Sequence, residues 1–132
     1  MSHFVAKIVE IESLESLHRV KLSKEDHNLS MISLELNEKV QIGLDVRLYV
    51  KASNIIIAKN KSEDISMANQ LQSSVISVEY GTILTNIKLD FLGNVLETLL
   101  TTHQAKKLNL QEGDEVYAFI NESDLSLVVM DN

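Results

Sequence analysis

Two short segments of the chain hold the side chains best suited to binding chemistry. Residues 51–54 read Lys-Ala-Ser-Asn, which places an ammonium group and a hydroxyl group at the end of a predicted strand. Residues 65–71 read Ile-Ser-Met-Ala-Asn-Gln-Leu, a run of small and polar side chains that leads into the next predicted strand. Such segments can supply the charge, hydroxyl, amide and backbone N–H donors that a tetrahedral oxyanion needs. The alternative is an ordinary turn followed by a linker, in which Lys, Ser and Asn are common.

The remaining sequence gives no sign of a catalytic centre. Cysteine is absent, which excludes disulfides, thiolate metal sites and cysteine nucleophiles. There is no Gly-x-Ser-x-Gly motif and no glycine-rich phosphate loop. The four histidines are scattered without the spacing of metal ligands, and they are His3, His18, His27 and His103. We therefore expect neither an enzyme nor a resident cofactor.

The composition is that of a compact soluble protein with an acidic charge balance. The 132 residues are 45% hydrophobic and carry a formal net charge of −7. An acidic chain with 5% aromatic residues is a poor candidate for nucleic-acid binding, which depends on Lys, Arg and stacking side chains. No apolar run approaches the roughly 18 residues of a membrane span, and the first residues lack a signal-peptide layout. We therefore expect a cytoplasmic protein that binds neither nucleic acid nor membrane.

Charge is distributed unevenly along the chain. Residues 1–61 hold nine basic and eight acidic side chains, whereas residues 62–132 hold three basic and eleven acidic ones. An anion site is therefore expected in the first half of the chain or beside it.

The chain aligns with itself, which indicates an internal repeat. Residues 4–11 align with residues 71–78 at an offset of 67. Later in each copy, residues 43–49 align with residues 113–119 at an offset of 70. The order of apolar blocks and turns is the same in both copies, so we predict two tandem units.

The two units, residues 1–61 and 65–132, are each predicted to be mostly strand. Short runs rich in Val, Ile, Leu and Thr alternate with polar turns, a pattern typical of small barrels. In the second unit the predicted strands are 71–80, 83–91, 95–101, 115–120 and 125–129. Five strands and at most one short helix per unit predict an all-β fold of two five-stranded OB-type barrels.

Local signals place the turns and the helix of the second unit. Leu92-Gly93-Asn94 predicts a hairpin, because Gly and Asn tolerate positive φ. Thr101 and Gln104 have the spacing of a capping box, which predicts a helix from that point to about Leu108. The first unit shortens the corresponding segment to residues 38–42.

Three motifs make the chain resemble the molybdate-binding Mop proteins, or molbindins, whose unit is also called the TOBE domain. Residues 66–71, Ser-Met-Ala-Asn-Gln-Leu, are similar to the segment that opens a unit in that family. Residues 112–116, Glu-Gly-Asp-Glu-Val, are similar to its turn, and residues 51–53, Lys-Ala-Ser, to the segment that closes a unit. The resemblance covers the whole chain as two tandem units and is strongest over residues 65–132.

The resemblance implies a protein that binds molybdate or tungstate noncovalently at interfaces between units or subunits. Ala68 stands where the family carries Arg, Asn121 stands where the second closing motif would have Lys, and the first unit lacks the opening motif. A complete pair of motifs therefore requires residues 51–53 of one unit to meet residues 66–69 of another. Both segments lie near the boundary between the units, so we expect them to meet at a subunit interface in a homo-oligomer, either a dimer or a trimer. The residues that the resemblance assigns to the oxyanion are Lys51, Ala52, Ser53, Ser66, Met67, Ala68, Asn69 and Thr101.

Three functions stay open at this point. The first is molybdate or tungstate storage, homeostasis or sensing in the cytoplasm. The second is a pair of TOBE units that serves oligomerisation or regulation without binding an oxyanion, which the departures from the motifs favour. The third, an enzyme or a nucleic-acid binder, would require clustered histidines or a basic strip in the fold.

Overall fold

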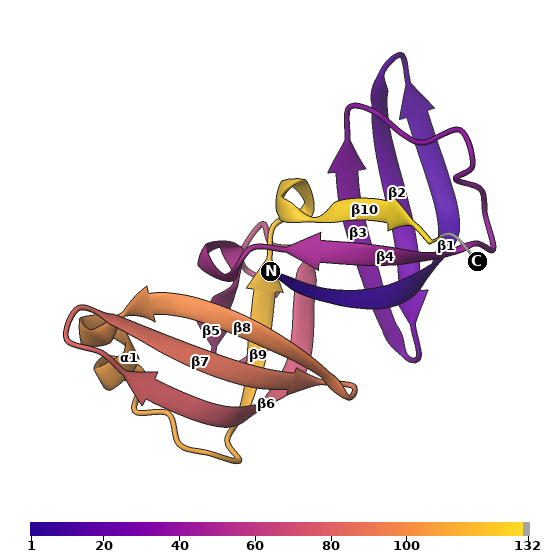
Figure 1. The fold of residues 1–132 in the computed structure, drawn as a ribbon. Coiled ribbons are helices and arrows are strands. Elements are labelled where there is room, and N and C mark those ends of the chain that lie inside the picture. Colours follow the sequence, from indigo (N-terminus) through magenta and orange to yellow (C-terminus); the bar gives the residue numbers. More distant parts are fainter. Residues whose placement is uncertain (131–132) are drawn as a thin grey trace.

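The chain folds almost entirely into β-strands, which curl into two five-stranded sheets (Figure 1). The computed structural model describes residues 1–130. The strands are β1 (Ser2–Leu14), β2 (Leu17–Lys24), β3 (His27–Ser33), β4 (Asp45–Val50), β5 (Ile56–Ala58), β6 (Asn69–Tyr80), β7 (Leu84–Phe91), β8 (Asn94–Thr101), β9 (Glu115–Ile120) and β10 (Ser126–Val129). The helical elements are α1 (Thr102–Leu108) and the short 3-10 turns η1 (Ala52–Asn54) and η2 (Glu122–Asp124). The predicted all-β class, with two five-stranded OB-type units, is confirmed.

Each sheet takes one edge strand from the other half of the chain. The first sheet has the order β10-β4-β1-β2-β3, and the second has the order β5-β9-β6-β7-β8. Strand β10 runs antiparallel to β4, and β5 runs antiparallel to β9. In Figure 1 the yellow strand β10 accordingly lies next to β4 at the edge of the first sheet, far from helix α1. The two sequence units therefore interlock within one chain.

The internal repeat extends to irregular features of the backbone. Strand β1 is bulged after Ile8 and β6 is bulged after Val75, and these residues are 67 positions apart. At each bulge a glycine with positive φ, Gly43 or Gly113, donates its N–H to the carbonyl of that residue at 2.8 Å. A bulge increases local twist and bends a strand. Both sheets are therefore curled by the same device.

The two sheets share one hydrophobic core. Buried residues of both sheets form a single cluster. Phe4 of β1 meets Phe91 of β7 edge to face, with ring centroids 5.2 Å apart, and both side chains are almost fully buried. Full burial of a side chain of this size stabilises a fold by about 1.5–3 kcal/mol.

The local predictions for the second unit are confirmed. Leu92 and Gly93 have φ of 50° and 86° and join β7 to β8 in a tight hairpin. Thr101 caps α1 by accepting a hydrogen bond from the N–H of Gln104, and the helix ends at Leu108. Residues 38–42 of the first unit form turns in place of this helix.

Candidate functional site

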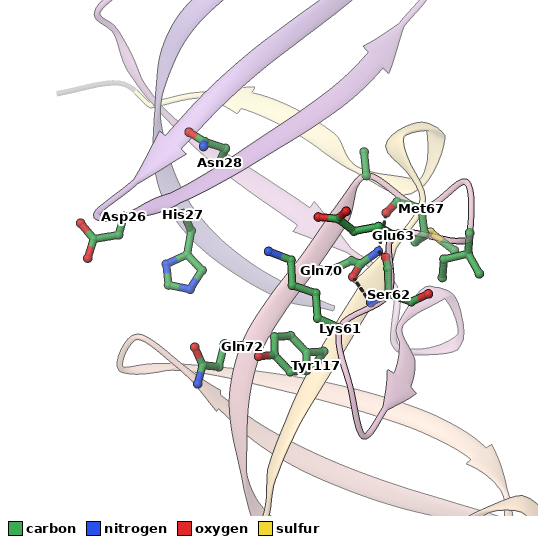
Figure 2. Close-up of a pocket in the computed structure, with 12 residues that line it drawn as sticks. Asp26, His27, Asn28, Lys61, Ser62, Glu63, Met67, Gln70, Gln72 and Tyr117 are labelled. Atoms are coloured by element: carbon green, nitrogen blue, oxygen red, sulfur yellow. Dashed lines mark hydrogen bonds between the residues drawn. The ribbon is translucent and has the colours of Figure 1, made fainter.

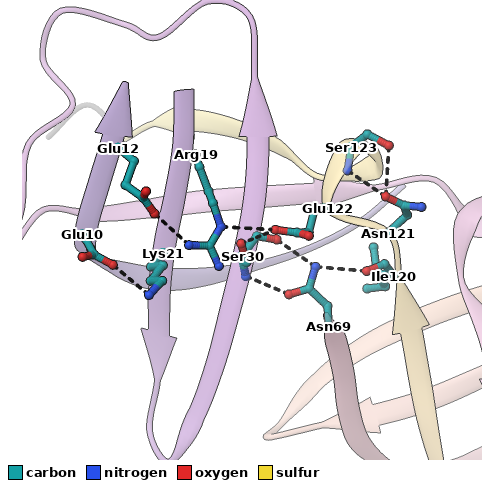
Figure 3. A network of polar contacts seen from close by, with 10 residues as sticks. All are labelled: Glu10, Glu12, Arg19, Lys21, Ser30, Asn69, Ile120, Asn121, Glu122 and Ser123. Carbon is teal, nitrogen blue, oxygen red and sulfur yellow. Dashed lines mark hydrogen bonds and ion pairs between the residues drawn. The ribbon is translucent and has the colours of Figure 1, made fainter. Parts of the chain in front are cut away.

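The opening segment, residues 66–69, lies at a corner where the two sheets meet. Asn69, the first residue of β6, is fully buried. Its Oδ1 accepts the Ser30 N–H at 2.8 Å, and its Nδ2 donates to the carbonyls of Ser30 at 2.8 Å and Ile120 at 3.0 Å (Figure 3). Both amide hydrogens are thus used inside the chain. Asn69 therefore positions the corner, and its amide is not free to donate to a ligand as the sequence led us to expect.

The other three residues of the opening segment face outward. Ser66 and Ala68 are exposed, and Met67 is half-buried. Within residues 1–130, no side chain or backbone group pairs with the Ser66 hydroxyl. This hydroxyl therefore remains available to a ligand or to another copy of the chain.

The repeat places an equivalent corner at the start of β1. Ser2 lies 67 residues before Asn69, and its Oγ accepts the N–H of Glu97 at 2.8 Å. Glu97 lies 67 residues after Ser30, so the two corners use corresponding residues. The first corner thus keeps the architecture even though its sequence lacks the opening motif.

The closing segment, Lys51-Ala52-Ser53, lies beside this first corner. Lys51 is the extended residue before η1, and its carbonyl accepts the N–H of Asn54 at 2.9 Å. Lys51 and Ser53 are exposed, and within residues 1–130 their side chains have no hydrogen-bond or ion-pair partner. Ala52 lines a cavity of about 430 Å³ that it shares with Ser2. The ammonium and hydroxyl of this segment are therefore presented to the outside.

Thr101 lies at the end of β8, where its oxygen accepts the Gln104 N–H at 3.3 Å. It is exposed, and a hydroxyl that accepts one bond still has a hydrogen to donate. Gln104 lines a groove of about 360 Å³ together with Ser53. The closing segment and the start of α1 thus border the same groove.

Within one chain the eight predicted residues fall into two groups. Lys51, Ala52 and Ser53 lie beside the first corner, with Thr101 close to the groove that Ser53 borders. The second group lies at the second corner, where Asn69 bonds to β3 and to the end of β9; its members are Ser66, Met67, Ala68 and Asn69. Within residues 1–130, no hydrogen bond or ion pair joins the two groups.

A polar cavity of about 620 Å³ borders the opening segment on one side. Met67 and Ala68 line it together with Lys61 and the β2–β3 hairpin residue His27. Figure 2 shows the Lys61 side chain extending into the space between that hairpin and β6. Gln70 ties the linker to β6 by accepting the Ser62 N–H at 2.9 Å. Lys61 was not identified from the motifs, although the basic excess of the first half pointed to such residues.

A second cavity, of about 400 Å³, borders Ala68 on the other side. Arg19 and Lys21 of β2 line it together with Asn28 and Ser30 of β3. Sequence reasoning missed these residues, because cross-strand packing brings them to the opening segment from far along the chain.

The two cations of this second cavity already have carboxylate partners (Figure 3). Lys21 binds Glu10 at 2.9 Å and lowers the pKa of that carboxyl group. Arg19 binds Glu12 at 2.8 Å, which raises the pKa of the guanidinium. Arg19 Nε also lies 3.7 Å from Glu122, whose carboxylate accepts the Ser30 hydroxyl. At this corner, carboxylates of the same chain thus bind two cations and the Ser30 hydroxyl.

Within residues 1–130, no cluster of three or more His, Asp or Glu side chains is arranged to hold a metal ion. In the same residues no helix is both long and apolar enough to cross a membrane.

Comparison with known proteins gives a consistent set of matches. A TOBE domain matches residues 65–127. A probable molybdenum-pterin-binding protein of Haemophilus influenzae is 36% identical over 66 residues, which cover 49% of this chain and 96% of that protein. The molybdenum import ATP-binding protein ModC of Brucella abortus is 30% identical over 112 residues, which cover 83% of this chain but 31% of ModC.

A solved structure matches the whole fold. The cytoplasmic molybdate-binding protein ModG, crystallised with molybdate bound, superposes with a TM-score of 0.84 and 22% sequence identity. The match covers 97% of this chain and 95% of that chain, so the interlocked pair of sheets is a fold already observed.

Proposed function

This chain belongs to the molybdenum-pterin-binding (Mop) family of TOBE-domain proteins, and we propose that it binds molybdate or tungstate. The role we propose is oxyanion storage, homeostasis or sensing in the cytoplasm, without catalysis. The molybdate bound to ModG and the molybdenum-related names of the sequence relatives support this choice of ligand.

The observation that carries the proposal is a set of uncommitted donors on the two predicted segments. The Lys51 ammonium and the Ser53 and Ser66 hydroxyls are exposed, and within residues 1–130 none has a side-chain partner. Molybdate at neutral pH is a tetrahedral dianion that accepts hydrogen bonds and donates none. An ammonium group and hydroxyl groups can donate to such an anion, and the ammonium also contributes a compensating positive charge.

We propose that the site forms where two copies of the chain meet. Ser30 links the opening segment to η2 of the same copy, because its N–H binds Asn69 and its hydroxyl binds Glu122. Asn121 and Glu122 stand at the positions that Lys51 and Ala52 hold in the first unit. A carboxylate there repels a dianion, so the segment after β9 in the same copy does not supply the cation of the closing motif. The closing segment of a second copy would supply Lys51 and Ser53, which makes the protein a homo-oligomer, either a dimer or a trimer.

The energy of such a site is sufficient for useful affinity. A hydrogen bond to a charged group contributes about 1.5–3 kcal/mol net. Five or six such bonds, less the costs of desolvation and ordering, reach about −8 kcal/mol, which corresponds to micromolar binding. Backbone N–H groups near Met67 and Ala68 can contribute whatever their side chains are.

One observation favours a second candidate function. Glu122 lies beside the opening segment and holds Ser30 and Arg19, so this corner is already satisfied by a carboxylate of the chain itself. A protein in which that contact is permanent would be an oligomerisation or regulatory module that binds no oxyanion. ModC, of which this chain spans 31%, illustrates a related sequence that forms part of a larger protein.

Calorimetric titration with molybdate and tungstate, with sulfate as the comparison anion, separates the two functions. We expect saturable binding of the larger anions and a rise in melting temperature, because a ligand that binds the folded form stabilises it. Lys51→Ala should weaken binding by about 2–3 kcal/mol without changing the melting temperature of the free protein, because the side chain is exposed. Lys106→Ala, an exposed lysine on α1, is the matched control. If neither molybdate nor tungstate binds at millimolar concentration, the oxyanion-binding function fails and the oligomerisation or regulatory function remains.

A further inference from the structure

The cavity between β2, β3 and Ala68 contains the groups of an anion site that no motif identifies. Arg19 and Lys21 alternate with buried residues along β2, so both point to the same face of the first sheet. The side chains of Asn28 and Ser30, from β3, line the same cavity. The cavity beside the opening segment is thus lined by residues that carry a guanidinium, an ammonium, a hydroxyl and an amide.

Glu122 shows which of these groups act together on an anion. Its carboxylate accepts the Ser30 hydroxyl and lies 3.7 Å from Arg19 Nε (Figure 3). Glu122 comes from η2, an element of the other half of the chain that reaches the first sheet across the corner. An oxyanion of two or more oxygens could accept from the same two donors.

The equivalent corner provides a comparison within the molecule. There Ala52 stands at the position of Glu122, and Glu97 stands at the position of Ser30. Asn86 corresponds to Arg19 at the same offset of 67. The first corner therefore has no guanidinium at the position of Arg19 and no carboxylate at the position of Glu122, although it carries Glu97 in place of Ser30. Among the described residues, the Arg19–Glu122 pair thus belongs to the second corner.

We propose that Arg19 and Ser30 form part of the oxyanion site beside the opening segment, and that Glu122 occupies these donors until the ligand displaces it. The proposal rests on the proposed function and adds residues to the same site. Displacement is feasible because Glu122 lies on a short 3-10 turn and its ion pair with Arg19 is partly exposed. Exposed ion pairs contribute little to the stability of a fold. A dianion offers these donors more charge than one carboxylate does.

Two variants test the roles separately by titration with molybdate. Arg19→Gln removes the guanidinium charge and should weaken molybdate binding at least tenfold. Glu122→Gln keeps the size of the side chain but removes the competing charge, and it should tighten molybdate binding at least threefold. Arg19→Lys, which keeps the charge without the forked donors, should lie between Arg19→Gln and the wild type, and it also serves if Arg19→Gln does not fold.

Matched controls come from the internal repeat. Lys88→Gln removes the lysine that corresponds to Lys21 in the second sheet, and Glu79→Gln removes the carboxylate that corresponds to Glu12. Neither should change molybdate affinity. A purely structural role for the Arg19–Glu122 contact would lower the melting temperature of the free protein in both test variants and leave the dissociation constant unchanged.

The outcomes distinguish this proposal from the proposed function. Molybdate binding by the wild type with unchanged affinity in Arg19→Gln and Glu122→Gln overturns the role of these residues and leaves the function standing. If the wild type binds neither large anion, the proposed function fails. In that case, molybdate binding by Glu122→Gln would still support the site at Arg19 and Ser30. If Glu122→Gln also fails to bind molybdate, that site is overturned.

Discussion

At the residue scale, Asn69 shows that a motif residue can be held entirely by hydrogen bonds within the chain. All of its amide hydrogens are committed to carbonyl groups, and its oxygen accepts the Ser30 N–H. These bonds tie β6 and β9 of the second sheet to β3 of the first. The motif thus includes one residue that builds the corner beside residues that stay free at its surface.

Replacement of Asn69 should therefore reduce stability sharply. Asn69→Ala leaves a buried N–H and two carbonyl groups without their partner, and each unsatisfied buried group costs about 1–3 kcal/mol. Urea denaturation should show a loss of at least about 2 kcal/mol. Ser2→Ala, at the equivalent corner, removes one acceptor and should cost about 1 kcal/mol. Equal losses in the two variants would mean that Asn69 has no special role in joining the sheets.

The cations of the candidate site illustrate the limit of sequence reasoning at the same scale. Lys51 and Ser66 were found because they stand in short motifs. Arg19, Lys21 and Lys61 were not, because only the pairing of β2 with β3 and the path of the linker bring them to Ala68. The uneven charge of the two halves was the signal that pointed toward them.

At the scale of single elements, turn and cap chemistry allowed most boundaries to be predicted. The hairpin at Leu92-Gly93 and the helix after Thr101 depend on local backbone preferences, which neighbouring residues determine. The exchange of β5 and β10 could not be predicted in this way. Strands of three and four residues fit either sheet by pattern, and only tertiary packing selects the partner.

Thr101 belongs to this scale because it caps α1. Thr101→Ala removes the acceptor of the Gln104 N–H and should lower the free energy of unfolding by about 1 kcal/mol. Thr101→Ser keeps the acceptor and should restore most of that stability. Molybdate titration of the same variants tests the resemblance: a ligand role requires weaker binding in Thr101→Ala and normal binding in Thr101→Ser. Unchanged affinity in both would restrict Thr101 to its cap.

At the scale of the whole molecule, strand exchange makes the two halves depend on one another. The fragment 1–61 lacks β10, and the fragment 65–132 lacks β5, so each would expose an edge of its sheet. Each would also lose half of the Phe4–Phe91 contact that joins the cores.

We therefore expect the full chain to unfold in one transition and the separate fragments not to fold as monomers. Circular dichroism during urea titration, compared with fluorescence of tyrosines in the two sheets, should give coincident curves for the full chain. Two separate transitions, or a folded monomeric fragment, would contradict the view that the sheets are interdependent.

The assembly of two copies is the central claim, and subunit mixing tests it most directly. Lys51→Ala damages the closing segment, and Ala68→Glu places a repelling carboxylate on the opening segment. Each variant alone should bind molybdate poorly. After the two are mixed and allowed to exchange subunits, junctions between an intact closing segment and an intact opening segment reappear, and calorimetry should show part of the wild-type binding restored. If exchange is verified by native mass spectrometry and no binding returns, the site does not lie between copies and the account is wrong.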